Sequence, residues 1–210
     1  MTSPKNGAFI TFEGIDGSGK STQSRLLAQF LQERSRDVIL TREPGGSKGA
    51  EEIRGLLVEG DPDRWSAHTE ILLFNAARRD HLEKTILPNV KAGKTVISDR
   101  FADSTRVYQG VARAELRPLV DQLHRLMIGV EPDLTFIIDM DPHAALTRGL
   151  ARRSGEDRFE DLGLDFQIEL RSGFLELAKD FPDRCHVIDG ARDADVIAND
   201  IAAITQDFLG

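Results

Sequence analysis

The stretch Ala8–Thr22, AFITFEGIDGSGKST, decides the fold of this 210-residue chain. Its first part, Ala8–Glu13, is a short apolar run rich in β-formers that ends at a glycine. Its second part, Gly14–Ser21, matches G-x-x-x-x-G-K-[ST] at every fixed position, and a helical pattern follows directly. Glycines here let backbone N–H groups turn inward around a phosphate chain, and the next helix N-terminus adds partial positive charge. The stretch predicts a strand, a phosphate-binding loop and a helix.

The residue types of this loop indicate a site for a nucleoside triphosphate. We expect Lys20 to bridge the β- and γ-phosphate oxygens and the Ser21 hydroxyl to take a place on Mg²⁺. The strand before the loop and the helix after it make a glycine-rich turn without a ligand the weaker alternative. The dinucleotide fingerprint G-x-G-x-x-G is excluded, because Thr22 follows where it would need a glycine. The predicted nucleotide-binding set is Gly14, Ile15, Asp16, Gly17, Ser18, Gly19, Lys20, Ser21 and Thr22.

Outside the loop, short apolar runs alternate with helical patterns. Strands are expected at Ala8–Glu13, Asp37–Thr41, Thr95–Ser98, Leu134–Asp139 and Cys185–Asp189. Helical patterns are expected at Lys20–Arg34, Lys48–Glu59, Ser66–Val90, Glu115–Ile128, from Pro142 onward, and at Ala194–Leu209. Five apolar strands alternating with helices predict a buried parallel sheet with helices on both faces. The predicted class is α/β, a three-layer sandwich in one domain over residues 1–210.

Composition and charge exclude several classes of protein. The formal net charge of −8 argues against sequence-independent binding to nucleic acid, which needs a basic surface. No apolar run approaches the ~18 residues of a membrane span, and the first residues lack a signal-peptide pattern. Cys185, the single cysteine, cannot form an internal disulfide. We therefore expect a cytoplasmic protein with no membrane or nucleic-acid partner.

Charged residues follow two of the predicted strands, where open α/β sheets bind their ligands. Arg42 follows the second strand, and Asp99 and Arg100 follow the third. We expect Asp99 to hold Mg²⁺ through water and the arginines to hold a second phosphate group. The alternative for Asp99 and Arg100 is a structural ion pair. Two arginines in addition to Lys20 favour two phosphorylated ligands, and Asp16 adds a carboxylate beside them.

The segment of about residues 148–162, which contains RGLARRSGEDRFED, has charges of both signs and interrupts the alternation of apolar runs and helical patterns. It can be a solvated helix end or a flap over a ligand, and the spacing does not decide between them.

Several motifs together resemble the bacterial thymidylate kinases. They are FEGIDGSGKST (Phe12–Thr22), TREPGG (Thr41–Gly46), LFNAAR (Leu73–Arg78), SDRF (Ser98–Phe101), STRVYQG (Ser104–Gly110), PDLTFIID (Pro132–Asp139) and DRFE (Asp157–Glu160). They follow the order of the family and extend from Phe12 to about Leu177. The resemblance implies a P-loop kinase fold with a lid, Mg²⁺-dependent transfer from ATP to dTMP giving ADP and dTDP, and a homodimer.

The resemblance also implies roles for single residues in dTMP binding. It implies that Asp16 accepts a hydrogen bond from the 3′-OH and that Arg42 and Arg100 bind the 5′-phosphate. Tyr108 is placed under the sugar, where its ring leaves no room for a ribose 2′-OH. The remaining members of the implied set are Phe74 (which stacks on thymine unless it is a core residue), Arg78, Ser104, Thr105 and Gln109. Two positions have no clear role: Glu160 in the lid, and Val107, which is expected beside the base and where several relatives carry Ala.

Other functions remain as alternatives. A GTPase would need an N-K-x-D element, which this sequence lacks. A nucleotide-binding module without catalysis would not need a second set of ligand contacts. The nearest alternative is a related nucleoside or nucleotide kinase with another acceptor.

Some thymidylate kinases carry an arginine that stabilises the transition state directly after the loop carboxylate. This chain has Gly17 at that position, so the resemblance implies that the arginine comes from another segment, and we expect it in the candidate lid, the segment of about residues 148–162. Arg152 and Arg153 lie near the middle of the candidate lid. We predict that Arg152→Ala combined with Arg153→Ala lowers kcat by at least about 100-fold with a modest change in the KM for dTMP. Steady-state kinetics test this, and near-normal turnover would make the segment a solvated loop only.

Overall fold

The computed structural model describes residues 7–60, 64–112, 114–150 and 163–210. Its sheet has the strand order β2-β3-β1-β4-β5, with every neighbouring pair parallel. The strands are β1 (Ala8–Glu13), β2 (Val38–Arg42), β3 (Thr95–Asp99), β4 (Leu134–Asp139) and β5 (Cys185–Asp189). The predicted five-stranded parallel sheet is confirmed, and β1 with its phosphate-binding loop lies at the centre.

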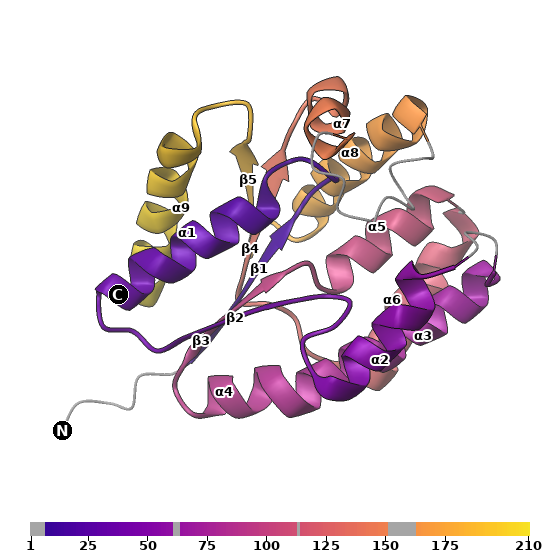
Figure 1. Ribbon diagram of the computed structural model, residues 1–210, viewed down its shortest axis with the longest axis horizontal. Helices are drawn as coiled ribbons and strands as arrows, with labels where there is room; N and C mark the ends of the chain where they lie inside the picture. The colour runs from indigo at the N-terminus through magenta and orange to yellow at the C-terminus, as the bar shows by residue number, and fades with distance from the viewer. Residues whose placement is uncertain (1–6, 61–63, 113, 151–162) are drawn as a thin grey trace.

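Helices cover both faces of the sheet, as predicted. Helices α1 and α9 lie on one face, and α3, α4, α5 and α8 lie on the other (Figure 1). The α-helices are α1 (Lys20–Glu33), α2 (Lys48–Val58), α3 (Ala67–His81), α4 (Leu87–Lys91), α5 (Ala102–Ala112), α6 (Arg117–Leu123), α7 (Pro142–Leu150), α8 (Gly163–Asp180) and α9 (Ala194–Leu209). Short π- or 3₁₀-helical segments are η1 (Leu82–Ile86), η2 (Ala114–Leu116) and η3 (His124–Ile128). No helix among the described residues is long and apolar enough to cross a membrane.

The sequence reading missed helix α5, which follows β3 and carries much of the site. The physical reason is burial: residues 102, 103 and 105–109 are all buried, so the polar residues of this helix do not mark an exposed face. Its buried positions include Asp103, Thr105, Arg106 and Gln109, which read as solvent-exposed in a sequence. The stretch Ser66–Val90 is helical as predicted, but the π-helical η1 divides it into α3 and α4.

Alternation along β1 sends successive side chains to opposite faces of the sheet. Ile10 and Phe12 pack with α1 and α9, and the Phe12 ring lies 5.3 Å from that of Phe136 on β4. On the opposite face Thr11 Oγ1 bonds Thr135 Oγ1 at 2.8 Å. Glu13, two residues further on, belongs to this second face and lies against the start of α5. The strand therefore delivers a buried carboxylate directly before the loop.

Candidate active site

The phosphate-binding loop turns through glycines with positive φ, among them Gly17 at 77° and Gly19 at 105°, and α1 begins at Lys20. The Lys20 ammonium donates to the carbonyl of Ile15 at 2.8 Å and lies 3.8 Å from the Asp16 carboxylate. Its side chain is thus folded back over its own loop. A phosphate chain in the loop would offer this buried cation stronger partners than one carbonyl.

Gly17 has a second reason to be glycine. A Cβ on this residue would lie 2.0 Å from the carbonyl oxygen of Ala145 on α7. That separation is far inside van der Waals contact, so α7 leaves no room for a side chain at this loop position. The place where some relatives carry an arginine is closed here by backbone packing.

A second cluster forms where β3 ends, next to the loop. Arg100 bonds the Asp16 carboxylate through Nη2, and the same Nη2 donates to the Tyr108 hydroxyl at 3.1 Å. Tyr108 in turn donates to Asp16 at 2.9 Å. Arg100 Nη1 donates to Ser104 Oγ at 2.8 Å and to the Gly14 carbonyl at 3.3 Å. Four residues that the sequence selected separately therefore touch one another.

Charge and burial act against each other in this cluster. Burial alone would raise the pKa of Asp16, but the charges of Arg100 and Lys20 lower it to about 2. Burial and the repulsion of Arg100 lower the pKa of Lys20 to about 8. Burial raises the pKa of Tyr108, so its phenol stays a hydrogen-bond donor. The cluster holds an ionised carboxylate between two cations.

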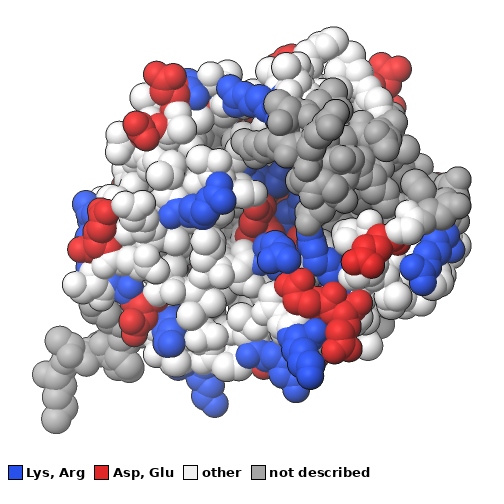
Figure 2. Space-filling view, in the orientation of Figure 1, with Lys and Arg blue, Asp and Glu red and all other residues white. Residues whose placement is uncertain are grey.

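Ser21 and Asp99 meet at the other side of the loop, where the Ser21 hydroxyl donates to the Asp99 carboxylate. Asp99 and Arg100 are therefore not the ion pair considered as an alternative: among the described residues, Arg100 pairs with Asp16. On this face of the molecule, basic and acidic side chains lie side by side near the centre instead of forming a purely basic patch (Figure 2).

Arg78 forms a third group, on α3. It is 3 % exposed, and Nε donates to Glu43 at 2.7 Å while Nη2 donates to Thr105 Oγ1 at 2.9 Å and to the Phe101 carbonyl at 3.1 Å. Among the described residues Nη1 has no partner, so two of its five N–H groups are open to a ligand. The sequence motifs assign no role to Glu43, although it stands inside TREPGG. His81 Nδ1 donates to the same carboxylate at 3.0 Å.

The remaining predicted residues lie around these groups. Gln109 is buried one turn after Thr105, and Phe74 is half-buried one turn before Arg78. Arg42 pairs in register with Asp99, but its side chain is 53 % exposed and bonds Glu51 at 3.2 Å. Arg152, Arg153 and Glu160 lie outside the described residues.

Val107 packs against helix α8. Its side chain belongs to the apolar cluster that includes Leu170 and Phe174. Neighbouring residues of a helix point about 100° apart, so Val107 turns away when Tyr108 faces the site. A Cβ on Gly173 would lie 2.9 Å from Val107 Cγ1, so the glycine of α8 makes room for the larger side chain.

Comparisons with known proteins find one family. A family model described as thymidylate kinase matches residues 12–201. Thymidylate kinase from Dinoroseobacter shibae is 68 % identical over 206 residues, covering 98 % of this chain and 99 % of that protein. The one from Ruegeria pomeroyi is 64 % identical over 203 residues, covering 97 % and 96 %. The crystal structure of thymidylate kinase from Ehrlichia chaffeensis matches with a TM-score of 0.78 and 41 % identity, covering 96 % of this chain and 99 % of that one.

Binding of a nucleoside triphosphate at pH 8 should take up about half a proton, because the phosphates raise the pKa of Lys20 from its value of about 8. Calorimetric titration in two buffers of different ionisation enthalpy measures the uptake. Lys20→Arg, whose guanidinium stays charged, should bind with little uptake. Exposed Lys91→Ala should behave like the wild type; equal uptake by the Lys20 variant would assign the proton elsewhere.

Proposed function

The chain belongs to the thymidylate kinase family, and we propose that the contact between its phosphate-binding loop and the Arg100 cluster is where its two substrates meet. The protein transfers a phosphoryl group from ATP to dTMP, giving ADP and dTDP. The observation that supports our assignment is that Asp16 lies 3.8 Å from Lys20 on one side and is bonded by Arg100 on the other. The donor and acceptor phosphates would then share one edge of the sheet.

Arg100 is our proposed anchor for the dTMP phosphate. Its Nη atoms are used by Gly14, Ser104, Asp16 and Tyr108, and among the described residues its Nε–H is left over. The long 3.3 Å bond to the Gly14 carbonyl is the one most readily exchanged for a phosphate oxygen. Arg42 at the neighbouring strand end would add a second cation once it leaves Glu51.

Asp16 and Tyr108 would bind the sugar. The Asp16 carboxylate stays ionised and has lone pairs beyond those used by Arg100 and Tyr108, so it can accept from a 3′-OH. The Tyr108 ring lies edge-on to Phe166 and Phe174, which restricts its movement away from the sugar. A fixed ring under the sugar disfavours a ribose.

The thymine ring would be read by α3 and α5. The open Nη1 of Arg78 can donate to a base carbonyl, and Glu43 and Thr105 hold the guanidinium in place. The amide of Gln109, buried with no hydrogen-bond partner among the described residues, can pair with the base edge. Phe74, half-buried on α3, would stack on the ring.

We propose Mg²⁺ as the metal that accompanies ATP. Ser21 and Asp99 place a hydroxyl and a carboxylate oxygen together at the loop, and oxygen ligands are what Mg²⁺ requires. The described residues contain no group of three or more acids, histidines or cysteines that would enclose a metal. Mg²⁺ does not need one, because phosphates and waters complete its coordination. When bound, it neutralises charge on the phosphates.

The protein residues would act by position and charge. Lys20 leaves the Ile15 carbonyl for the phosphates of ATP, and Arg100 aligns the acceptor phosphate for in-line transfer. That phosphate is already an anion, so no general base is required. We propose Arg152 and Arg153, outside the described residues, as the source of the remaining positive charge, since Gly17 has no side chain and no room for one.

Arg100→Ala should raise the KM for dTMP about 100-fold and change the KM for ATP by less than about threefold, because a charge-assisted phosphate contact is worth roughly 1.5–3 kcal/mol. Steady-state kinetics with each substrate varied separately test this order. Wild-type enzyme should use dTMP at least about 1000-fold better than thymidine or the ribonucleotide. Equal use of thymidine would contradict the proposed phosphate contacts.

We also propose a homodimer, a single domain and a cytoplasmic location. The family resemblance supports the dimer, and so do the exposed apolar side chains of Leu72, Leu126 and Met127, on α3 and η3. The Arg79 side chain joins these two segments, because its Nη1 donates to the Met127 carbonyl at 2.8 Å. The one continuous sheet supports a single domain, and free, buried Cys185 fits a reducing compartment.

Sedimentation tests the dimer. Leu126→Glu should convert a dimeric wild type to monomer at micromolar concentration, because a buried unpaired charge opposes association. Val196→Glu, on the exposed part of α9, is the control and should leave the mass unchanged. A monomeric wild type would contradict the proposal.

A further inference from the structure

Glu13, the last residue of β1, has an environment that the proposed substrate contacts do not explain. It is 0 % exposed, and no Lys or Arg side chain bonds it among the described residues. It accepts two hydrogen bonds, from the Phe101 backbone N–H at 2.8 Å and from the Ser104 hydroxyl at 2.6 Å. Both donors come from the turn between β3 and α5, which is the turn that carries Arg100.

The first bond holds the backbone around Arg100. This residue has φ of 73°, a left-handed conformation that non-glycine residues adopt only when their surroundings enforce it. The end of β1 enforces it at two successive positions: Arg100 N–H donates to the Phe12 carbonyl at 2.9 Å, and Phe101 N–H donates to Glu13. The direction of the Arg100 side chain therefore depends on the Glu13 carboxylate.

The second hydrogen bond, from the Ser104 hydroxyl to Glu13, fixes the direction in which this hydroxyl donates. Ser104 has one hydroxyl hydrogen, and it is given to Glu13. The oxygen lone pairs of Ser104 are then free to accept from Arg100 Nη1 at 2.8 Å. Glu13, Ser104 and Arg100 form a chain in which an ionised carboxylate at one end orients the guanidinium at the other.

We propose that Glu13 is a positioning residue for the acceptor phosphate, acting through Phe101 N–H and Ser104 Oγ to hold Arg100 in its phosphate-binding orientation. It touches neither substrate. This rests on the proposed role of Arg100, which the Arg100→Ala experiment tests separately. If that experiment succeeds and the one below fails, only the role of Glu13 is lost.

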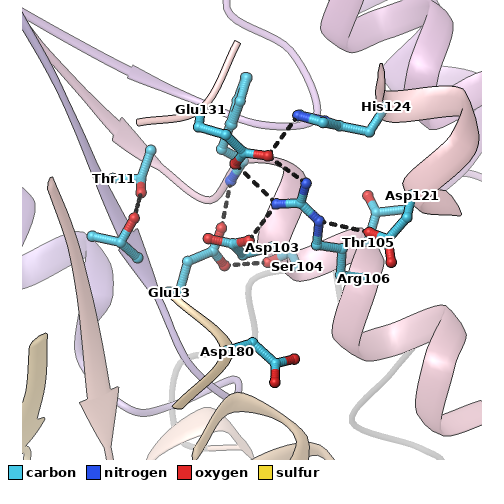
Figure 3. Close-up of polar contacts among 12 residues, drawn as sticks. Thr11, Glu13, Asp103, Ser104, Thr105, Arg106, Asp121, His124, Glu131 and Asp180 are labelled. Carbon is cyan, nitrogen blue, oxygen red and sulfur yellow. Dashed lines mark hydrogen bonds and ion pairs between the residues drawn. The ribbon is translucent and has the colours of Figure 1, made fainter. Parts of the chain in front are cut away.

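The groups facing Glu13 decide when it is ionised. Asp103 of α5 lies beside it, as Figure 3 shows, and Arg100, Lys20 of α1 and Cys185 of β5 also act on it. Burial and the charge of Asp103 raise the pKa of Glu13 to about 7, against the opposing effect of Arg100 and the two hydrogen bonds.

Asp103 is itself bonded by two cations. Arg106 donates to it at 2.8 Å and also bonds Glu131 (Figure 3). Arg184 donates to Asp103 at 2.6 Å and pairs with the same glutamate. Both protonation states of Glu13 are thus populated near neutral pH. The protonated form has a hydrogen on one of the two oxygens that Phe101 and Ser104 need.

The decisive variant is Glu13→Gln, which keeps the shape of the side chain and imitates its protonated state. We expect the KM for dTMP to rise about tenfold at pH 8.5 and the KM for ATP to stay within about twofold. The ratio of wild-type to variant kcat/KM for dTMP should fall towards 1 as the pH drops through 7. Titration of the dTMP phosphate cancels in this ratio. A ratio independent of pH, or equal losses for both substrates, would overturn the proposal.

The thermal stability of the Glu13→Gln variant should change with pH in the direction opposite to its use of dTMP. A carboxyl with a raised folded-state pKa stabilises fully below its unfolded value of about 4.5 and loses this contribution as the pH rises through about 7. The Tm of Glu13→Gln relative to wild type should therefore increase from pH 5.5 to pH 8.5, while dTMP use becomes relatively worse. A variant that loses relative stability and activity together over this range would show Glu13 to be structural only.

Two further variants complete the test. Thr11→Val removes a buried hydrogen bond two residues earlier on the same strand face and should leave the KM for dTMP within about twofold. Ser104→Ala removes the hydroxyl that links Glu13 to Arg100. The ratio of wild-type to Ser104→Ala kcat/KM for dTMP should depend on pH in the same way, which keeps the test available if the Glu13 variant does not fold. Combined with Glu13→Gln, Ser104→Ala should add less than about twofold, because both break one chain. Fully additive losses would overturn the bridge.

Discussion

The ion pair between Arg100 and Asp16 is the contact on which the rest of the site depends. It joins the loop after β1 to the turn after β3, and these two segments are adjacent only because β1 and β3 pair in the parallel sheet. The carboxylate comes from the loop that we propose for the ATP phosphates, and the cation comes from the turn that we propose for the dTMP phosphate. One interaction would then fix the separation between the donor and acceptor phosphates.

Such a site concentrates charge where water is scarce, and the fold compensates locally. Asp16 is stabilised by Arg100, Lys20 and the Tyr108 hydroxyl, which is why its pKa falls to about 2 despite burial. Glu43 accepts hydrogen bonds from Arg78 and His81. Glu13 has two neutral donors and a like charge nearby, so its pKa moves in the opposite direction. Neighbouring cations thus keep Asp16 ionised, while burial and a like charge bring the pKa of Glu13 near neutral pH.

The sequence predicts the sheet, all five strands within one residue at each end, and the loop, because apolar runs and glycine spacing report local requirements. It does not predict α5, whose polar residues are buried, or the partners of those residues. Glu13 and Glu43 lie inside quoted motifs, yet their roles come from Phe101, Ser104 and Arg78, which are between 35 and 91 positions away. The contact between Val107 and Gly173 is also set by the packing of α5 on α8, which no local pattern records.

Packing also explains why positive charge for the transition state is not built into this loop. Ala145 of α7 brings its carbonyl to within 2.0 Å of where a Cβ on Gly17 would be, so a longer side chain would have to displace the helix. The close approach of α7 supports the loop in its phosphate-binding shape, and in exchange it removes the position for an arginine. The cations that remain at the sheet edge, Lys20 and Arg100, already have partners in the ground state. Charge that forms only during transfer would then need a further cation, and this is the role that we propose for Arg152 and Arg153.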